Sequence, residues 1–288
     1  MATLRDIKRR ITAVKSTKQI TKAMKMVAAA KLRRAQNRMI DMRPYADKMN
    51  SVIASMTGGE AVHPLLVKRP RKTVEILILS SDRGLCGAYN TNIIKAAEKI
   101  IATRHDEKFN VSISIVGKKA ADYYKRRDIE IRKSWVGLSG KLTYTDAQEI
   151  GSNIVESYVN ETIDEVFIIY NKFVTVMNQE VTVKKLMPVS ADASDAAAEE
   201  PSTVFIFEPS QKEILNQLLP KNVEVQIYRA LLESQASEEA ARMTAMENAT
   251  QNADEMIERL TLQYNKARQA TITKELMDIV GGVEALKD

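Results

Sequence analysis

Apolar residues in the first 57 positions recur with a seven-residue period. Positions spaced alternately by three and four residues form one stripe, and thirteen of its sixteen members are apolar. A 3.5-residue period sustained through about eight heptads is typical of a helix that supercoils with another helix. We call this stripe the N-terminal seam; it comprises Leu4, Ile7, Ile11, Val14, Lys18, Thr21, Lys25, Ala28, Leu32, Ala35, Met39, Met42, Ala46, Met49, Ile53 and Met56.

The three polar members of the seam are consecutive. Lys18, Thr21 and Lys25 interrupt an otherwise apolar stripe. Because the interruption is local, we interpret it as a site where the helix does something other than pair.

The C-terminal part of the chain predicts the partner helix. Residues 221–280 contain no Gly and no Pro, and sixty helical residues span roughly 90 Å. Between Ala230 and Ala253 seven alanines favour helix and allow close approach of another backbone. Two unrelated surface helices are the alternative, but neither could easily bury its stripe alone. We therefore predict an antiparallel coiled coil of the two chain ends, the second contributing Ala253, Met256, Ile257, Leu260, Tyr264 and Ala267.

Between the two helices, strand and helix patterns alternate, which is typical of a mostly parallel, doubly wound α/β sheet. The predicted fold is a Rossmann-like α/β domain inserted into a coiled coil: residues 1–60 and 209–288 form the helices and residues 70–208 the α/β domain. Residues 191–201 are acidic and alanine-rich, as in a surface loop. Strands are expected at Thr73–Ser80, Val111–Val116, Ile129–Trp135 and Glu165–Tyr170, with antiparallel additions at Val181–Met187 and Thr203–Phe207, and helices from about Asn90 to Arg104, Lys118 to Arg126 and Thr145 to Val159.

Charge is concentrated at the N-terminus. The 288 residues carry 43 Lys and Arg against 37 Asp and Glu, but residues 1–48 alone hold fourteen basic and three acidic residues. Such a segment predicts an acidic partner, which could be nucleic acid, anionic lipid or an acidic protein surface. Nucleic acid is one candidate, although the basic residues are not interleaved with aromatic ones as single-strand binding requires.

Few residues offer catalytic or metal chemistry. One cysteine, Cys86, excludes an internal disulfide framework, and with only His63 and His105 a histidine metal site is improbable. The N-terminus lacks the apolar region of a signal peptide, and no apolar run approaches the 18 or so residues that span a bilayer. We expect an intracellular protein, soluble or peripheral to a membrane.

A nucleotide site is the obvious alternative for such a sheet. The loop Ser81–Gly87 follows the first strand, but its glycines do not have the dinucleotide spacing. Gly137–Lys141 offers a Gly-Lys pair. However, the position five residues before Gly140, where a phosphate loop needs glycine, is Trp135, and Leu142 stands where the magnesium-binding hydroxyl is needed. We therefore predict no cofactor, and keep a nucleotide-dependent enzyme only as a rival hypothesis.

Four longer motifs resemble the gamma subunit of F-type ATP synthases: residues 20–36 (ITKAMKMVAAAKLRRAQ), 81–90 (SDRGLCGAYN), 237–253 (SEEAARMTAMENATQNA) and 264–282 (YNKARQATITKELMDIVGG). The resemblance runs in order from Arg5 to Leu286. It implies a non-catalytic rotor in which the terminal helices form a shaft inside a ring of alternating alpha and beta subunits, with no nucleic acid and no direct small-molecule substrate as partner.

The resemblance also implies which residues meet partners. Acidic loops of the beta subunits are expected near the basic segment 18–31. The residues expected to contact the alpha–beta ring are Lys18, Met24, Lys25, Arg242, Arg268, Gln269 and Thr273.

Two further contact regions follow from the same resemblance. Phe205, Phe207 and Glu208 are expected to contact the epsilon subunit and the membrane rotor ring. An apolar tip that turns in a sleeve of the alpha–beta ring is expected at Ile272, Leu276, Ile279, Val280, Val283 and Leu286.

The expected location follows from the N-terminus. Lack of a transit peptide points to a bacterial chain on the cytoplasmic face of the plasma membrane.

Overall fold

The computed structural model describes residues 3–57, 63–67, 69–70, 72–189 and 210–285. The chain divides into two compact units. Unit 1 comprises Met1–Val27 and Met243–Asp288, and unit 2 comprises Ala28–Arg242. The predicted strand at Thr203–Phe207 and the loop over 191–201 lie outside the described residues.

The N-terminal stretch forms one helix, α1, over Leu4–Thr57. Thr3 begins it with a capping box, in which the backbone N–H groups of Thr3 and Asp6 donate to each other's side chains. These hydrogen bonds from Thr3 lower the pKa of Asp6. The N-terminal seam lies on this helix and is called the α1 seam from here on. None of its sixteen positions is exposed, which confirms the heptad pattern.

The C-terminal helix, α5, spans Gln211–Ala285. It begins ten residues before the Gly- and Pro-free stretch and continues through Pro220. Proline removes one backbone hydrogen bond, but Leu215 and Leu219 on the same turns are 2% and 0% exposed, so packing offsets that loss. Among the described residues, no helix is apolar over a length that would cross a bilayer.

Unit 2 contains a five-stranded sheet in the order β3-β2-β1-β4-β5. The first four strands are parallel, and β5 pairs antiparallel with β4. This confirms the predicted doubly wound sheet. The strands are β1 Thr73–Leu79, β2 Asn110–Val116, β3 Glu130–Trp135, β4 Glu165–Phe173 and β5 Gln179–Met187.

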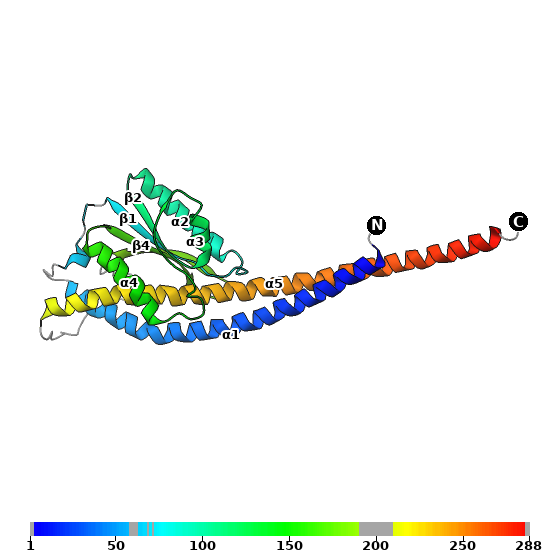
Figure 1. The fold of residues 1–288 in the computed structure, drawn as a ribbon. Helices are drawn as coiled ribbons and strands as arrows, with labels where there is room; N and C mark the ends of the chain where they lie inside the picture. The colour runs from blue at the N-terminus through cyan, green and yellow to red at the C-terminus, as the bar shows by residue number, and fades with distance from the viewer. Residues whose placement is uncertain (1–2, 58–62, 68, 71, 190–209, 286–288) are drawn as a thin grey trace. The chain divides into compact units, whose positions relative to one another are not determined.

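Helices cover both faces of the sheet (Figure 1). Helices α2 (Tyr89–Asp106) and α3 (Lys118–Tyr124) pack on the face that carries Val74, Ile76 and Ile78. Helix α4 (Tyr144–Val159) and the unit 2 segments of α1 and α5 cover the opposite face, together with the 3-10 turn η1 (Pro64–Leu66). The long helices therefore belong to the core of the α/β domain as well as to the coiled coil.

One glycine is required where β2 leads into α3. Gly117 has φ +97°, and a Cβ there would lie 2.2 Å from the carbonyl oxygen of Ser80. Gly137 has a similar φ of +86°, but a Cβ there meets nothing within 4 Å. The two positions separate backbone strain from steric overlap.

We predict that Gly117→Ala lowers the free energy of unfolding by about 3 kcal/mol, from left-handed strain of about 1–2 kcal/mol plus overpacking. Gly137→Ala is the control and should cost about 1 kcal/mol, from strain alone. Urea unfolding followed by circular dichroism measures both. Equal losses in the two variants would contradict a tight approach at Ser80.

Candidate functional site

The polar interruption of the α1 seam faces polar residues of α5 within unit 1. The hydroxyls of Thr21 and Thr250 lie 2.8 Å apart, and Lys18 Nζ lies 2.5 Å from Asp254 Oδ1. Lys25 forms an ion pair with Glu247. The two helices remain paired here, through hydrogen bonds and ion pairs in place of apolar contacts, and a further role of this site stays a prediction.

The α5 side of this pairing has its own heptad spacing, which we call the α5 seam. It comprises Met246, Thr250, Ala253, Ile257, Leu260, Tyr264 and Ala267, none of which is exposed. Met256, expected in the seam, is 44% exposed and lies outside it. The residue numbers of the three polar pairs add to 271 or 272, which places Leu4, the first seam residue, opposite Ala267.

Beyond Ala267, α5 continues without a seam. Every described side chain from Arg268 to Val280 is exposed, including the predicted ring contacts Arg268, Gln269 and Thr273. Of the predicted apolar tip, Ile272, Leu276, Ile279 and Val280 are 48%, 58%, 64% and 60% exposed. The side chain of Val283 and all of Leu286 lie outside the described structure.

This apolar stripe is not a continuation of the seam. At about 100° per residue, the stripe through Ile272, Leu276 and Ile279 lies roughly 110° around the helix from the α5 seam. It therefore presents a new apolar face, which extended pairing with α1 in the same register would not bury.

Within unit 2, Arg242 is also part of an internal network. Its guanidinium lies 2.5 Å from Glu238 and 2.9 Å from Glu239, and Lys31 of α1 approaches Glu239 at 3.6 Å. Burial raises the pKa of Glu238, against the lowering effect of Arg242. Burial also acts to lower the pKa of Arg242, but the two carboxylates outweigh it and the pKa is raised. With 8% exposure, Arg242 has a direct role inside the chain.

The loop after β1, which carries the SDRGLCGAYN motif, is fixed by one carboxylate. Asp82 accepts hydrogen bonds from the backbone N–H groups of Lys118, Gly137 and Ser139, at 3.0, 3.0 and 2.9 Å. Lys118 is the first residue of α3. A helix N-terminus binds anions, and here the anion is the protein's own Asp82.

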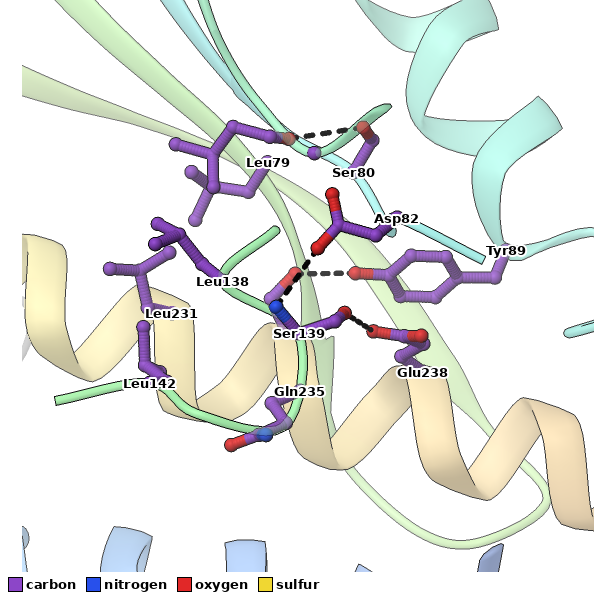
Figure 2. Close-up of a pocket in the computed structure, with 13 residues that line it drawn as sticks. Leu79, Ser80, Asp82, Tyr89, Leu138, Ser139, Leu142, Leu231, Gln235 and Glu238 are labelled. Carbon is purple, nitrogen blue, oxygen red and sulfur yellow. Dashed lines mark hydrogen bonds between the residues drawn. The ribbon is translucent and has the colours of Figure 1, made fainter. Parts of the chain in front are cut away.

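A small cavity lies beside this loop (Figure 2), between the carboxyl edge of the sheet and α5. Its volume is about 40 Å³, and its wall includes Ser80, Tyr89, Leu138, Gln235 and Glu238. A cavity of this size has room for water, whereas ligand pockets are typically about 300–1,000 Å³.

Cys86 is 2% exposed and belongs to the core beneath α2. Burial raises the pKa of its thiol, and thiolate nucleophiles need a lowered pKa. His63 uses its Nδ1 to accept the backbone N–H of Leu65. Among the described residues, no three His, Cys, Asp or Glu side chains cluster as metal ligands.

Several of these residues were not predicted from the sequence. Asp82 was considered only as part of a possible phosphate loop, and Glu247, Thr250 and Asp254 were not identified as partners. The α5 partners carried a usable signal, because they fall at or beside the α5 heptad positions. The predicted contacts Phe205, Phe207 and Glu208 lie outside the described residues.

Comparison with known proteins agrees with two paired terminal helices and an inserted doubly wound domain. A family model described as ATP synthase matches residues 3–286. The central stalk of the Tetrahymena thermophila mitochondrial ATP synthase shares 26% identity at a TM-score of 0.61, covering 80% of this chain and 99% of that one. A Euglena gracilis ATP synthase chain matches at a TM-score of 0.67 and 21% identity, covering 98% and 94%, and supports the fold.

These matches define the class as rotor subunits of ATP synthases. Two full-length relatives specify it further: the ATP synthase gamma chains of Geotalea daltonii and Trichlorobacter lovleyi are 48% and 47% identical, each over 100% of both chains. The chain belongs to the ATP synthase gamma chain family. It is a central-stalk rotor subunit of an F-type ATP synthase.

The polar interruption of the α1 seam can be tested by a charge swap. Lys25 and Glu247 are 41% and 37% exposed, so their ion pair contributes at most about 1 kcal/mol. We predict that Lys25→Glu speeds hydrogen exchange of the α1 amides in unit 1, because two carboxylates then face each other. Adding Glu247→Lys should restore protection at low salt, and high salt should shrink both effects. Loss of protection that the second change does not reverse would contradict this pairing.

Proposed function

We propose that this chain is the non-catalytic part of its complex, and that it couples ion flow through the membrane rotor ring to ATP synthesis or hydrolysis on the alpha–beta ring. Rotation of an asymmetric helical shaft would present a different face to each catalytic site in turn. The observation that carries this proposal is the continuation of α5 beyond its seam, with an exposed apolar stripe. Pairing with α1 alone does not require the segment of α5 beyond Ala267.

The apolar tip fits a bearing inside a sleeve. Apolar contacts are not directional, so a stripe such as Ile272, Leu276 and Ile279 can turn against an apolar wall without remaking ion pairs at each step. Val280, Val283 and Leu286 complete the proposed bearing. Arg268, Gln269 and Thr273, exposed just before it, are proposed to meet the rim of the ring.

The basic segment fits acidic loops on the beta subunits. Lys18 and Lys25 are 37% and 41% exposed even though each is ion-paired with α5, so both can reach a second acidic group. Exposed pairs of about 0–1 kcal/mol can break and re-form as the shaft turns. Arg242, also predicted to contact the ring, is 8% exposed and pairs with Glu238 and Glu239. We propose that it contributes to the ring contact by holding this segment of α5 in place.

The proposed division of labour follows the chain. Residues 1–60 and 209–288 are the shaft, and residues 70–208 are the stalk domain, with Phe205, Phe207 and Glu208 as the foot that meets the epsilon subunit and the membrane ring. Similarity to bacterial gamma chains supports a peripheral position on the cytoplasmic face of the plasma membrane.

We predict that Met24→Lys uncouples ATP hydrolysis from ion pumping. Met24 is partly buried beside Lys25, in the polar interruption of the α1 seam. A lysine there adds a cation that faces the acidic loops of the beta subunits, and a strong ion pair with one loop would hold the shaft at one rotational angle. In vesicles reconstituted with the full complex, pumping per ATP should fall while hydrolysis persists. Ile40→Lys, at a 56% exposed position further along α1, is the control and should pump normally. Equal pumping in both variants would argue against this placement of Met24.

Reconstitution tests the proposed function directly. Alpha and beta subunits are mixed with or without this chain, and ATPase activity is measured. We expect activity to depend on the chain, and the isolated chain to bind neither ATP nor DNA. Salt-sensitive DNA binding without any effect on the alpha–beta assembly would favour the nucleic-acid hypothesis instead.

A further inference from the structure

The segment of α5 from Asn222 to Arg242 is buried on almost every side within unit 2. Six of its 21 residues are leucine or alanine, and the polar residues Ser234, Ser237 and Glu238 are also buried, at 5%, 0% and 6% exposure. Polar side chains in such a place cost free energy unless they find partners. Their partners show what holds this helix.

All three residues bond to the carboxyl edge of the sheet. The hydroxyls of Tyr89 and Ser234 lie 2.5 Å apart, and Ser237 Oγ donates to the backbone oxygen of Asn171 at 2.9 Å. Ser139 Oγ donates to Glu238 Oε2 at 3.3 Å (Figure 2). The three contacts come from different elements: the start of α2, the end region of β4 and the loop after β3.

The groups that hold α5 are themselves fixed to the sheet. Asp82 binds the backbone N–H of Ser139, and Asn171 Nδ2 donates to the backbone oxygen of Tyr89 at 3.3 Å. On the far side of α5, Lys31 of α1 pairs with Glu239. The helix is therefore held from two directions by groups that are not free to follow it.

These contacts differ in kind from the seams. Apolar packing depends on area and tolerates small rotations or shifts, whereas a hydrogen bond weakens steeply once its distance or angle departs from the optimum. A rotation of α5 by one residue, about 100°, or a slide of about 1.5 Å, would leave these buried groups unpaired. Three such bonds on one face favour a single angle and a single height for α5.

We infer that Tyr89, Asn171 and Ser139 are positioning residues for torque transmission. Together with Ser234, Ser237 and Glu238 they fix the rotational angle of α5 against the sheet. Torque applied to the α/β domain therefore turns α5 with the domain, and the domain does not rotate around the helix. We call these six residues the α5 lock. The torque role rests on the proposed rotor function, whereas the fixed angle is a property of the isolated chain.

The fixed angle is tested first in the full chain alone. Spin labels at Lys99→Cys on α2 and Lys221→Cys on α5, both exposed and both in unit 2, report the position of the helix by electron paramagnetic resonance distance measurement. Cys86 is 2% exposed, and its labelling is checked in the chain without added cysteines. We expect Tyr89→Phe/Ser237→Ala to widen the distance distribution about two-fold, because two of the three directional bonds are lost.

A matched variant removes the same groups elsewhere. In Tyr158→Phe/Ser55→Ala the deleted hydroxyls bond to the backbone oxygens of Val67 and Val52, not to α5. This control should keep the narrow distribution. Should the test variant fail to fold, as judged by circular dichroism, Tyr89→Phe alone removes one oxygen atom and decides the question by the same measurement.

The torque role is tested in the reconstituted complex. With the α5 lock weakened, ATP hydrolysis should continue while ion pumping per ATP falls about two-fold, and the control variant should pump normally. An unchanged distance distribution would overturn the lock itself. A widened distribution with unchanged pumping would overturn its role in torque. Failure of the wild-type chain to support ATPase activity would count against the proposed function and leave the distance result standing.

Discussion

The structure depends on one constraint: a helix as long as α5 must be partnered along its length by groups that lie on other parts of the chain. Its apolar positions cannot pack against each other, and an isolated helix gains little from propensity alone. In unit 1 the partner is α1, and in unit 2 it is both α1 and the carboxyl edge of the sheet. α1 begins at Leu4, opposite Ala267, so α5 has no α1 partner beyond Ala267, and its described side chains from Arg268 to Val280 are exposed.

The two units meet this constraint with different chemistry. In unit 1 the seams combine apolar side chains with a pair of hydroxyls and partly exposed ion pairs, and such exposed ion pairs contribute little individually. In unit 2, buried hydroxyls of α5 and Glu238 bond to groups of the α/β domain, and the guanidinium of Arg242 pairs with Glu238 and Glu239 of the same helix. Buried polar groups are specific in geometry because a lost partner is costly. The part of α5 inside the domain is thus the more narrowly defined in position.

Much of this could be predicted from the sequence, for identifiable reasons. The α1 seam was predictable because a period of 3.5 residues has no other common cause, and β1 and β4 because their apolar runs are short and uninterrupted. The antiparallel β5 was predictable from its place after β4. The stretch without Gly and Pro begins only at residue 221, after Pro220, and the burial of Leu215 and Leu219 shows what holds the helix together through that proline.

The polar contacts between individual residue pairs were the main feature that the sequence did not predict. Lys18, Thr21 and Lys25 were interpreted as an interruption because a hydropathy pattern records which positions are polar and not what they face. The same limit hid the contacts of Asp82, whose three partners come from residues far apart in the sequence. Such contacts follow from the tertiary fold.

Asp82 also has a consequence for how this domain can be controlled. In doubly wound sheets the carboxyl edge is where metabolites and nucleotides enter and where their binding changes the protein's shape. Here the chain's own Asp82 accepts the first backbone N–H of α3, and α5 lies across the same edge beside a cavity of about 40 Å³. The edge that holds a ligand in other doubly wound sheets therefore holds a helix of the same chain here.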